Sequence, residues 1–197
     1  MASNESERPA QEALRYGRSA QDAHEDARQA RLRQLIADHF NPVWKFLRRI
    51  GVPAQLAEDV SQEVFLVAAR RVDDIKAGPA TERSFLLGTA YRVSRDLGRK
   101  AHRESLQDVD AELAAMPSPE EQLDEKRACE VIYRLLSELD EDVRAIFVMY
   151  EMDGMTMNEI AQVLGLPIGT VGSRLRRARD DFKARFERHR KRLKEVR

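Results

Sequence analysis

Residues 156–178 read TMNEIAQVLGLPIGTVGSRLRRA, and this stretch carries the strongest structural signal in the chain. Thr156 is followed three residues later by Glu159, a capping-box pattern that begins a helix. Gly165 stands where the chain has to turn sharply, and glycine accepts the positive φ that such a turn requires. The second helix has an apolar stripe at Ile168, Val171, Leu175 and Ala178. The spacing of Ala161, Gly165 and Val171 therefore predicts a helix-turn-helix.

The outer face of this second helix combines small hydroxyl side chains with arginines. It is formed by Thr170, Ser173, Arg174 and Arg177 at positions i, i+3, i+4 and i+7. Small hydroxyls let a helix enter a major groove, and guanidinium groups reach base edges or phosphates. An ordinary helical hairpin with a solvated basic face is the alternative. The twelve basic against four acidic residues of 170–197 favour DNA binding.

Charge is segregated along the chain, although 34 basic and 34 acidic residues give a formal net charge of zero. Residues 104–129 hold eight acidic and two basic side chains, together with Pro117 and Pro119. Few large apolar residues interrupt them. This composition predicts a flexible acidic linker at 104–128 between two domains.

Helical periodicity precedes the linker. Residues 1–28 are polar and predict a mobile arm, and 29–103 predict a first helical domain. Its first helix is expected to kink or restart at Pro42, with Asn41 as N-cap. A second helix is expected at 53–71, a loop at 72–83 and a third helix at 84–103. The expected apolar stripes are Leu56, Val60, Val64 and Val67 in the second helix and Leu86, Ala90, Val93 and Leu97 in the third.

Beyond the linker, 129–187 predict a second helical domain that contains the helix-turn-helix, and 188–197 predict a basic tail. No strand-type alternation stands out in the sequence. The expected fold class is therefore all-α, with two small helical domains joined by the acidic linker.

The sequence lacks the residue patterns that are typical of several functional classes. Cys129 is the single cysteine, the four histidines are scattered, and the sequence has no glycine-rich phosphate loop. We therefore expect no metal site, no cofactor and no enzymatic activity. The polar N-terminus and the lack of a long apolar run predict no signal peptide and no membrane insertion, hence a cytoplasmic protein.

Three stretches together resemble one known family. LGLPIGTVGSRLRRAR (164–179) is similar to the promoter-reading region of extracytoplasmic-function sigma factors of the sigma-70 type. AEDVSQEVFLVAARR (57–71) resembles their core-polymerase-binding segment, and FLLGTAYRVSRDLGRKAHRE (85–104) resembles the segment that melts and reads the minus-10 element. The resemblance covers about residues 30–185 and includes sigma regions 2 and 4 in the family's order.

The resemblance implies a non-enzymatic subunit that binds core RNA polymerase, at its clamp and flap, and directs initiation at promoter DNA. An anti-sigma factor is an implied further partner. The residues matched to core-polymerase binding are Asp59, Gln62, Glu63 and Phe65. Those matched to the minus-10 element are Arg92, Arg95, Asp96, Arg99 and Lys100. Those matched to the minus-35 element are Thr170, Ser173, Arg174 and Arg177.

Some positions depart from the family pattern or admit a second reading. Gly172 stands where relatives usually carry Lys or Arg, Asp96 where they usually carry Asn, and Gly88–Thr89 near a usual Trp. Phe65 is either a contact residue or part of the core.

The competing functions are a stand-alone helix-turn-helix regulator with a sensing or dimerising N-terminal domain, and a protein-interaction bundle. In the free protein, the two domains are expected to be either mobile or docked.

Overall fold

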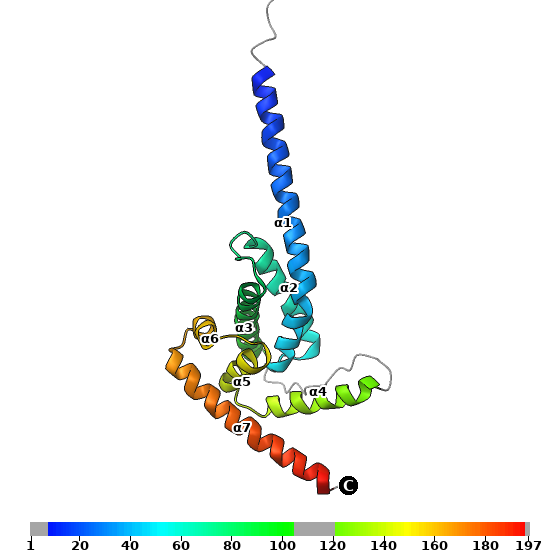
Figure 1. The fold of residues 1–197 in the computed structure, drawn as a ribbon, viewed down its shortest axis with the longest axis vertical. Helices are drawn as coiled ribbons and strands as arrows, with labels where there is room; N and C mark the ends of the chain where they lie inside the picture. The colour runs from blue at the N-terminus through cyan, green and yellow to red at the C-terminus, as the bar shows by residue number, and fades with distance from the viewer. Residues whose placement is uncertain (1–7, 105–120, 196–197) are drawn as a thin grey trace, which may run out of the picture.

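The computed structural model describes residues 8–104 and 121–195, and within them the side chains of 20–97 and 129–192. All regular secondary structure in these ranges is helical (Figure 1). The elements are α1 (Arg8–Arg49), α2 (Ala54–Arg70), α3 (Pro79–Glu104), α4 (Glu121–Ser137), α5 (Glu141–Phe147), the π-helical turn η1 (Val148–Met152), α6 (Met157–Leu164) and α7 (Ile168–Glu195). The predicted all-α fold class is confirmed.

The C-terminal part of α1 packs with α2 and α3 in the first bundle (Figure 1). All three helices contribute fully buried side chains to its core, including Phe46, Leu47, Val60, Val64, Leu86 and Ala90. Phe40 of α1 stacks on Phe65 of α2 with ring centroids 5.9 Å apart. Burial of these apolar side chains is the main stabilising contribution to the bundle.

Helix α1 is longer and more continuous than the sequence predicted. It begins at Arg8, inside the predicted arm, and continues through Pro42 to Arg49 without a restart. The prediction of a restart with Asn41 as N-cap is therefore wrong. Asn41 and Pro42 both lie on the exposed side of α1, while Val43 on the next position is buried. Water can solvate the carbonyl that proline leaves without a donor. The apolar packing of the neighbouring residues therefore keeps α1 helical through Pro42.

The predicted stripe of α2 is only partly the buried face. Val60 and Val64 are buried, but Leu56 is 49% exposed. The remaining core positions of α2 are Ala57, Ser61, Phe65 and Ala68. Three of these four are small side chains, which a stripe of large apolar residues leaves out and which pack where two helices lie close together. In α3, the predicted stripe residue Leu97 is likewise 42% exposed.

The loop before α3 is shorter than predicted, because α3 begins at Pro79 rather than at residue 84. Proline is favoured in the first turn of a helix, where its missing N–H is not needed. Val72 and Ile75 anchor the loop in the core. From α1, Arg28 donates to the carbonyl of Ala69 at 3.0 Å and pairs with Asp73 at 3.2 Å.

Helices α4 to α7 form the second bundle, in which α5 packs along α7 (Figure 1). Its buried residues include Leu136, Val143, Ile146, Met149, Ile160, Val171, Leu175 and Ala178. Phe147 and Phe182 stack with ring centroids 4.9 Å apart. Helix α4 begins at Glu121, inside the predicted linker, whose residues 105–120 lie outside the described part of the chain.

Candidate nucleic-acid interface

The helix-turn-helix has the local geometry that its sequence predicts. The backbone N–H of Glu159 donates to Thr156 Oγ1 at 3.3 Å, and the N–H of Thr156 donates to Glu159 Oε2 at 2.7 Å, which completes the capping box. Helix α6 ends at Gly165, whose φ of 64° lies in the left-handed region. The capping box and Gly165 fix the two ends of this eight-residue helix.

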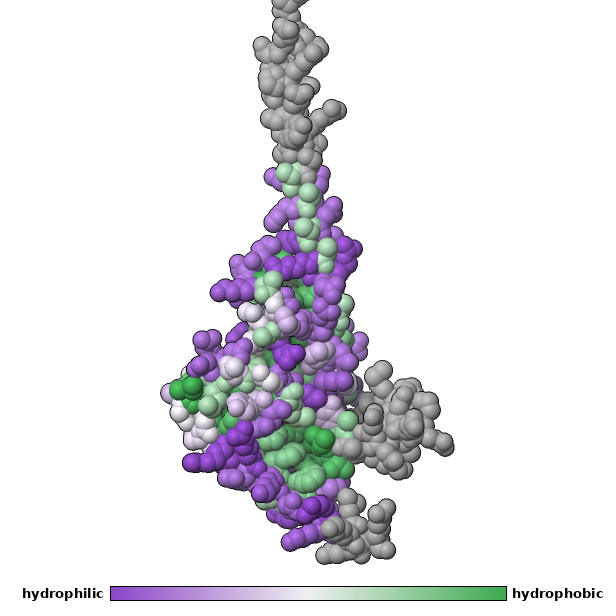
Figure 2. Space-filling view, viewed as in Figure 1, coloured by the Kyte–Doolittle hydropathy of each residue, from purple (hydrophilic) through white to green (hydrophobic). Residues whose placement is uncertain are grey.

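Helix α7 follows α6 after three residues and presents two different faces. Val171, Leu175 and Ala178 are buried against α5 and α6, as predicted. Ile168, predicted as part of this stripe, is instead 48% exposed at the first position of α7. Figure 2 shows apolar surface at the junction of α6 and α7, and a hydrophilic surface along α7 beyond it.

Three of the four predicted minus-35 residues lie at or near the outer face of α7. Ser173 and Arg177 are exposed, and Thr170 is half-buried. The Ser173 hydroxyl donates to the carbonyl of Thr170 at 3.0 Å, within the first two turns. Arg174 lies on the flank toward α5 and its side chain is only 35% exposed.

Arg176 belongs to the outer face, although the sequence analysis did not select it. It is exposed, it lies one turn beyond Ser173, and it has no ion pair among the side chains that the structure describes. The apolar stripe of Val171, Leu175 and Ala178, which is buried on the opposite side of α7, could have indicated this from the sequence. Counted from that stripe, Arg176 points more directly outward than Arg174 does.

Carboxylates from α5, η1 and the segment between α4 and α5 pair with four arginines of α7. Arg177 Nη2 lies 2.6 Å from Asp140 Oδ2, and Arg174 Nη1 lies 3.4 Å from Asp142 Oδ2. Further pairs join Arg179 to Glu151 at 2.6 Å and Arg185 to Glu138 at 2.9 Å. The guanidinium of Arg179 also lies over the Tyr150 ring, 5.2 Å from its centroid. The sequence analysis did not anticipate this acidic partner set.

Helix α3 carries the predicted minus-10 residues. Arg92 is exposed, with Nη2 3.5 Å from Thr89 Oγ1. Arg95 is exposed too, and it donates to the Tyr91 hydroxyl at 3.2 Å. Asp96 is exposed beside them. Arg99 and Lys100 lie within α3, but their side chains are outside the described residues.

One face of α2 is acidic and open. Asp59, Gln62 and Glu63 are exposed, and no side chain in the described ranges forms an ion pair with either carboxylate. Leu66, one turn further, is 53% exposed and extends this face at i+7 from Asp59. Phe65 is 6% exposed and stacks on Phe40, so its ring packs in the core of the first bundle.

The two bundles contact each other through α3 and α6. A Cβ atom on Gly88 would lie 2.8 Å from Val163 Cγ2, closer than real Cβ contacts, so the absence of a side chain permits this approach. Beside it, Ser84 Oγ donates to Glu159 Oε1 at 2.5 Å. This hydrogen bond, and those from Thr156, lower the pKa of Glu159. Helix α3 therefore packs directly on the helix-turn-helix.

Asp153 is a second junction between the bundles. Its carboxylate Oδ1 lies 3.3 Å from Arg49 Nη1 of α1, and its carbonyl accepts from Arg83 Nη1 of α3 at 3.1 Å. The other carboxylate oxygen, Oδ2, is buried without a hydrogen-bond partner among the described residues. Burial raises the pKa of Asp153 to about 6, and the two arginines only partly oppose that shift.

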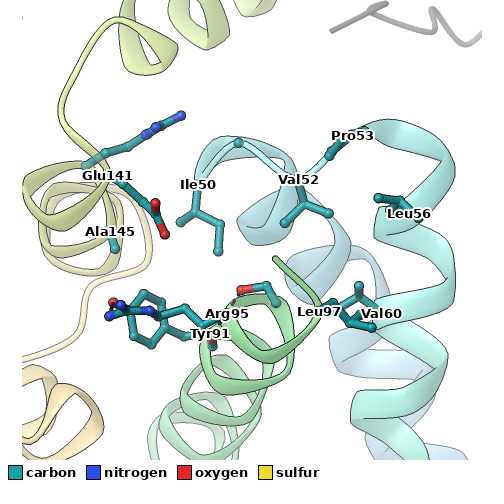
Figure 3. Close-up of a pocket in the computed structure, with 13 residues that line it drawn as sticks. Ile50, Val52, Pro53, Leu56, Val60, Tyr91, Arg95, Leu97, Glu141 and Ala145 are labelled. Carbon is teal, nitrogen blue, oxygen red and sulfur yellow. Dashed lines mark hydrogen bonds between the residues drawn. The ribbon is translucent and has the colours of Figure 1, made fainter. Parts of the chain in front are cut away.

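A cavity of about 470 Å³ lies between α3, α5 and the turn that joins α1 to α2 (Figure 3). Figure 3 shows Arg95 of α3 and Glu141 of α5 on its wall, with Leu56 and Leu97 at another side. Arg144 also lines it, and burial lowers the pKa of this guanidinium. Gly51 in the turn has a φ of 104°, and a Cβ there would lie 2.5 Å from Arg144 Nη1.

Among the described residues, no group of three His, Cys, Asp or Glu side chains is arranged to hold a metal ion. None of the described helices has the length and hydropathy needed to cross a membrane. A helix-turn-helix with a basic outer face, joined in one chain to a second bundle with its own basic helix, defines a two-domain, all-α class of nucleic-acid-binding protein.

Comparison with protein families identifies the family to which this chain belongs. Residues 35–104 match the family model described as sigma-70 region 2, and residues 129–181 match that of sigma-70 region 4. The chain belongs to the sigma-70 family and is a sigma factor of the extracytoplasmic-function group.

Two relatives illustrate the extent of the similarity. The chain is 28% identical to the ECF RNA polymerase sigma factor SigE of Mycolicibacterium smegmatis over 79% of its own length and 62% of that protein. It is 29% identical to the ECF RNA polymerase sigma-E factor of Escherichia coli over 66% of its length and 73% of that protein.

Two solved structures share the fold. CnrH, in complex with the cytosolic domain of CnrY, superposes with a TM-score of 0.57 and 25% identity, over 79% of this chain and 87% of CnrH. The sigma factor RpoE of Bartonella quintana, in complex with the anti-sigma factor NepR, superposes with a TM-score of 0.66 and 22% identity. That match covers 79% of this chain and 96% of RpoE.

Proposed function

We propose that this protein binds core RNA polymerase in the cytoplasm and directs it to promoters with two separated elements, without an enzymatic activity of its own. One observation carries the proposal. A single chain presents two basic helices in two bundles, α3 and α7, together with an acidic face on α2 that has no ion-pair partner in the described part of the protein. A stand-alone repressor needs neither the second basic helix nor the open acidic face.

Each proposed contact has a distinct chemistry. The α2 face formed by Asp59, Gln62, Glu63 and Leu66 would contact a basic surface of the core polymerase. The outer face of α7 would enter the major groove at the minus-35 element, with Arg177 as the principal base-reading residue. Helix α3 would hold the minus-10 strand through Arg92, Arg95 and Asp96, with Arg99 and Lys100 as further candidates.

The docked arrangement has to open for this function. Two promoter elements separated by more than one turn of DNA lie at least about 34 Å apart along its axis. Helices α3 and α6 are in direct contact in the docked form, through Gly88 and Val163. Binding to the polymerase would separate them, and an anti-sigma partner would favour a state in which both DNA-binding helices are covered.

The test is reconstituted transcription. The purified protein is added to core RNA polymerase lacking other sigma factors, with genomic fragments as template, and transcript starts are mapped. Starts that share two upstream elements at fixed spacing support the proposal. Absence of transcription and of co-migration with core polymerase would favour a stand-alone regulator.

A charge-reversal pair tests the core-binding face separately. Glu63→Arg is expected to abolish co-migration with core polymerase, because it places a cation against the basic partner surface. Glu58→Arg makes the same charge change on an exposed position outside that face and is expected to leave co-migration unchanged. Equal loss in both variants would contradict the assignment of the α2 face.

A further inference from the structure

The corner between α4 and α5 carries four carboxylates, and three of them face an arginine of α7. Glu138 pairs with Arg185 at 2.9 Å, Asp140 with Arg177 at 2.6 Å and Asp142 with Arg174 at 3.4 Å. The last two pairs hold the two arginines that were predicted to contact the minus-35 element, Arg177 and Arg174. The same guanidinium groups are the ones that a DNA contact would require.

The position of Asp140 makes this pairing informative. Asp140 is the N-cap residue of α5, where an aspartate usually accepts a hydrogen bond from the backbone of its own helix. Its side chain makes no such cap. The carboxylate instead lies against Arg177, 37 residues away in the sequence. Its orientation is therefore set by α7 and not by the helix it begins.

The fold does not depend on these pairs. The Asp140 and Arg177 side chains are 65% and 63% exposed, and exposed ion pairs contribute little to folding stability. The contact of α5 with α7 rests on buried apolar residues, among them Val143, Ile146, Val171 and Leu175. A contribution to folding stability therefore does not explain why Asp140 and Asp142 pair with Arg177 and Arg174.

We propose that Asp140 and Asp142 act as internal competitors of DNA, each holding an arginine that promoter DNA must take over. This inference rests on the proposed DNA-reading role of α7. A guanidinium held at 2.6 Å by a carboxylate has to release it before forming a bidentate contact to a base or phosphate. The two aspartates thereby weaken binding of the free protein to DNA of any sequence. Asp181, one turn along α7, lies 3.8 Å from Arg177 and adds to this effect.

The test measures affinity of the full chain for a labelled duplex of arbitrary sequence, by fluorescence anisotropy at fixed salt. Asp140→Asn removes the charge and keeps a residue that is equally favoured at an N-cap. We expect about two- to fivefold tighter binding, the fold-change that corresponds to loss of one exposed ion pair. Asp142→Asn, which releases Arg174, is expected to act in the same direction and more weakly, because its pair is longer.

Glu141→Gln is the matched control. Glu141 lies between the two aspartates, is exposed, and makes no ion pair with α7 among the described residues. The variant changes net charge by the same amount and is expected to leave affinity unchanged. Equal tightening in Glu141→Gln and Asp140→Asn would overturn the inference, because net charge alone would then explain it.

The Arg177→Ala background separates the inference from the proposed function. The gain from Asp140→Asn is expected to disappear there, since no arginine remains to be released. If Arg177→Ala weakens binding but Asp140→Asn does not tighten it, the competitor role is wrong and the DNA-reading role stands. If neither the wild type nor Asp140→Asn binds DNA, and the wild type also fails in promoter-directed transcription, both are wrong.

Discussion

Arg174 and Arg177 have the same side chain but different surroundings, and this difference predicts their roles. The Arg177 side chain is 63% exposed on the outer face, whereas that of Arg174 is 35% exposed on the flank toward α5. Sequence spacing placed both on one reading face. The structure favours Arg177 and its neighbour Arg176 for contact with base edges.

Alanine substitution tests this division at the level of single residues. Arg177→Ala is expected to reduce discrimination between promoter and mismatched minus-35 DNA by about 1–3 kcal/mol, as loss of one bidentate base contact does. Arg174→Ala is expected to reduce it less. Arg188→Ala, exposed further along α7, is expected to weaken binding to all sequences alike. Competition binding with matched and mismatched duplexes measures all three, and a larger loss in Arg174→Ala contradicts the division.

Asp153 predicts a pH dependence of stability. Its pKa of about 6 in the folded protein exceeds the value of 3.8 for an unperturbed carboxyl. The folded state therefore binds the proton more tightly than the unfolded chain. Stability is expected to decrease as pH rises from about 4 to about 6 and then to level off, at most by roughly 1.4 kcal/mol per pH unit.

Urea unfolding at several pH values measures this dependence as a difference between variants. In Asp153→Asn the decline is expected to be absent, because no group at that position titrates. Asp26→Asn, on the exposed part of α1, serves as the control and is expected to keep the wild-type profile. Parallel profiles for the wild type and Asp153→Asn would contradict the role of Asp153.

At the scale of elements, the helix-turn-helix joins a short helix to a long one, since α6 has eight residues and α7 has 28. Short helices depend on their ends, because the first N–H groups have no partner within the helix. The capping box and Gly165 satisfy these needs locally. A few residues therefore set the two ends of α6, while α7 is also held by its packing on α5.

Thr156→Ala tests the capping box. Loss of the Thr156 Oγ1 acceptor is expected to lower the free energy of unfolding by about 1 kcal/mol. Thr156→Ser retains the hydroxyl and is expected to stay close to the wild type. Chemical denaturation measures both variants, and equal destabilisation of the two would show that the methyl group, not the cap, is responsible.

At the scale of the whole molecule, the contact between α3 and α6 is one of those that hold the two bundles together, beside the contacts of α1 with α4 and η1. Gly88 lies opposite Val163 at the closest point of this contact. Val163 is β-branched and stiff, so it accommodates an added atom poorly. We therefore expect a single methyl group at Gly88 to weaken docking.

Gly88→Ala is expected to shift the protein toward an open form with a larger radius of gyration in small-angle scattering. The added Cβ would meet Val163 Cγ2 at 2.8 Å. In Gly88→Ala/Val163→Ala both γ-carbons are removed, and the compact form is expected to return. Unchanged scattering of the single variant, with its helix content intact, would contradict the docking role of Gly88.

Much of the helix-turn-helix was predictable from sequence, because its determinants act over a few residues. The Thr156–Glu159 cap, the left-handed Gly165 and the stripe of Val171, Leu175 and Ala178 are all confirmed. The helical fold class and the family resemblance were predictable for the same reason. Errors arose where packing overrode local preference, as at Pro42 inside α1 and at the exposed Leu56.

Local sequence accounts for the helices, the helix-turn-helix and the basic character of α3 and α7, since each depends on neighbours within one or two turns. Which of these residues meet depends on the tertiary packing. The partner of Arg177 lies 37 residues away, and that of Ser84 lies 75 residues away. The raised pKa of Asp153 and the approach of Gly88 to Val163 likewise require two bundles in contact. Distances between residues remote in sequence are set by packing, and no local pattern encodes them.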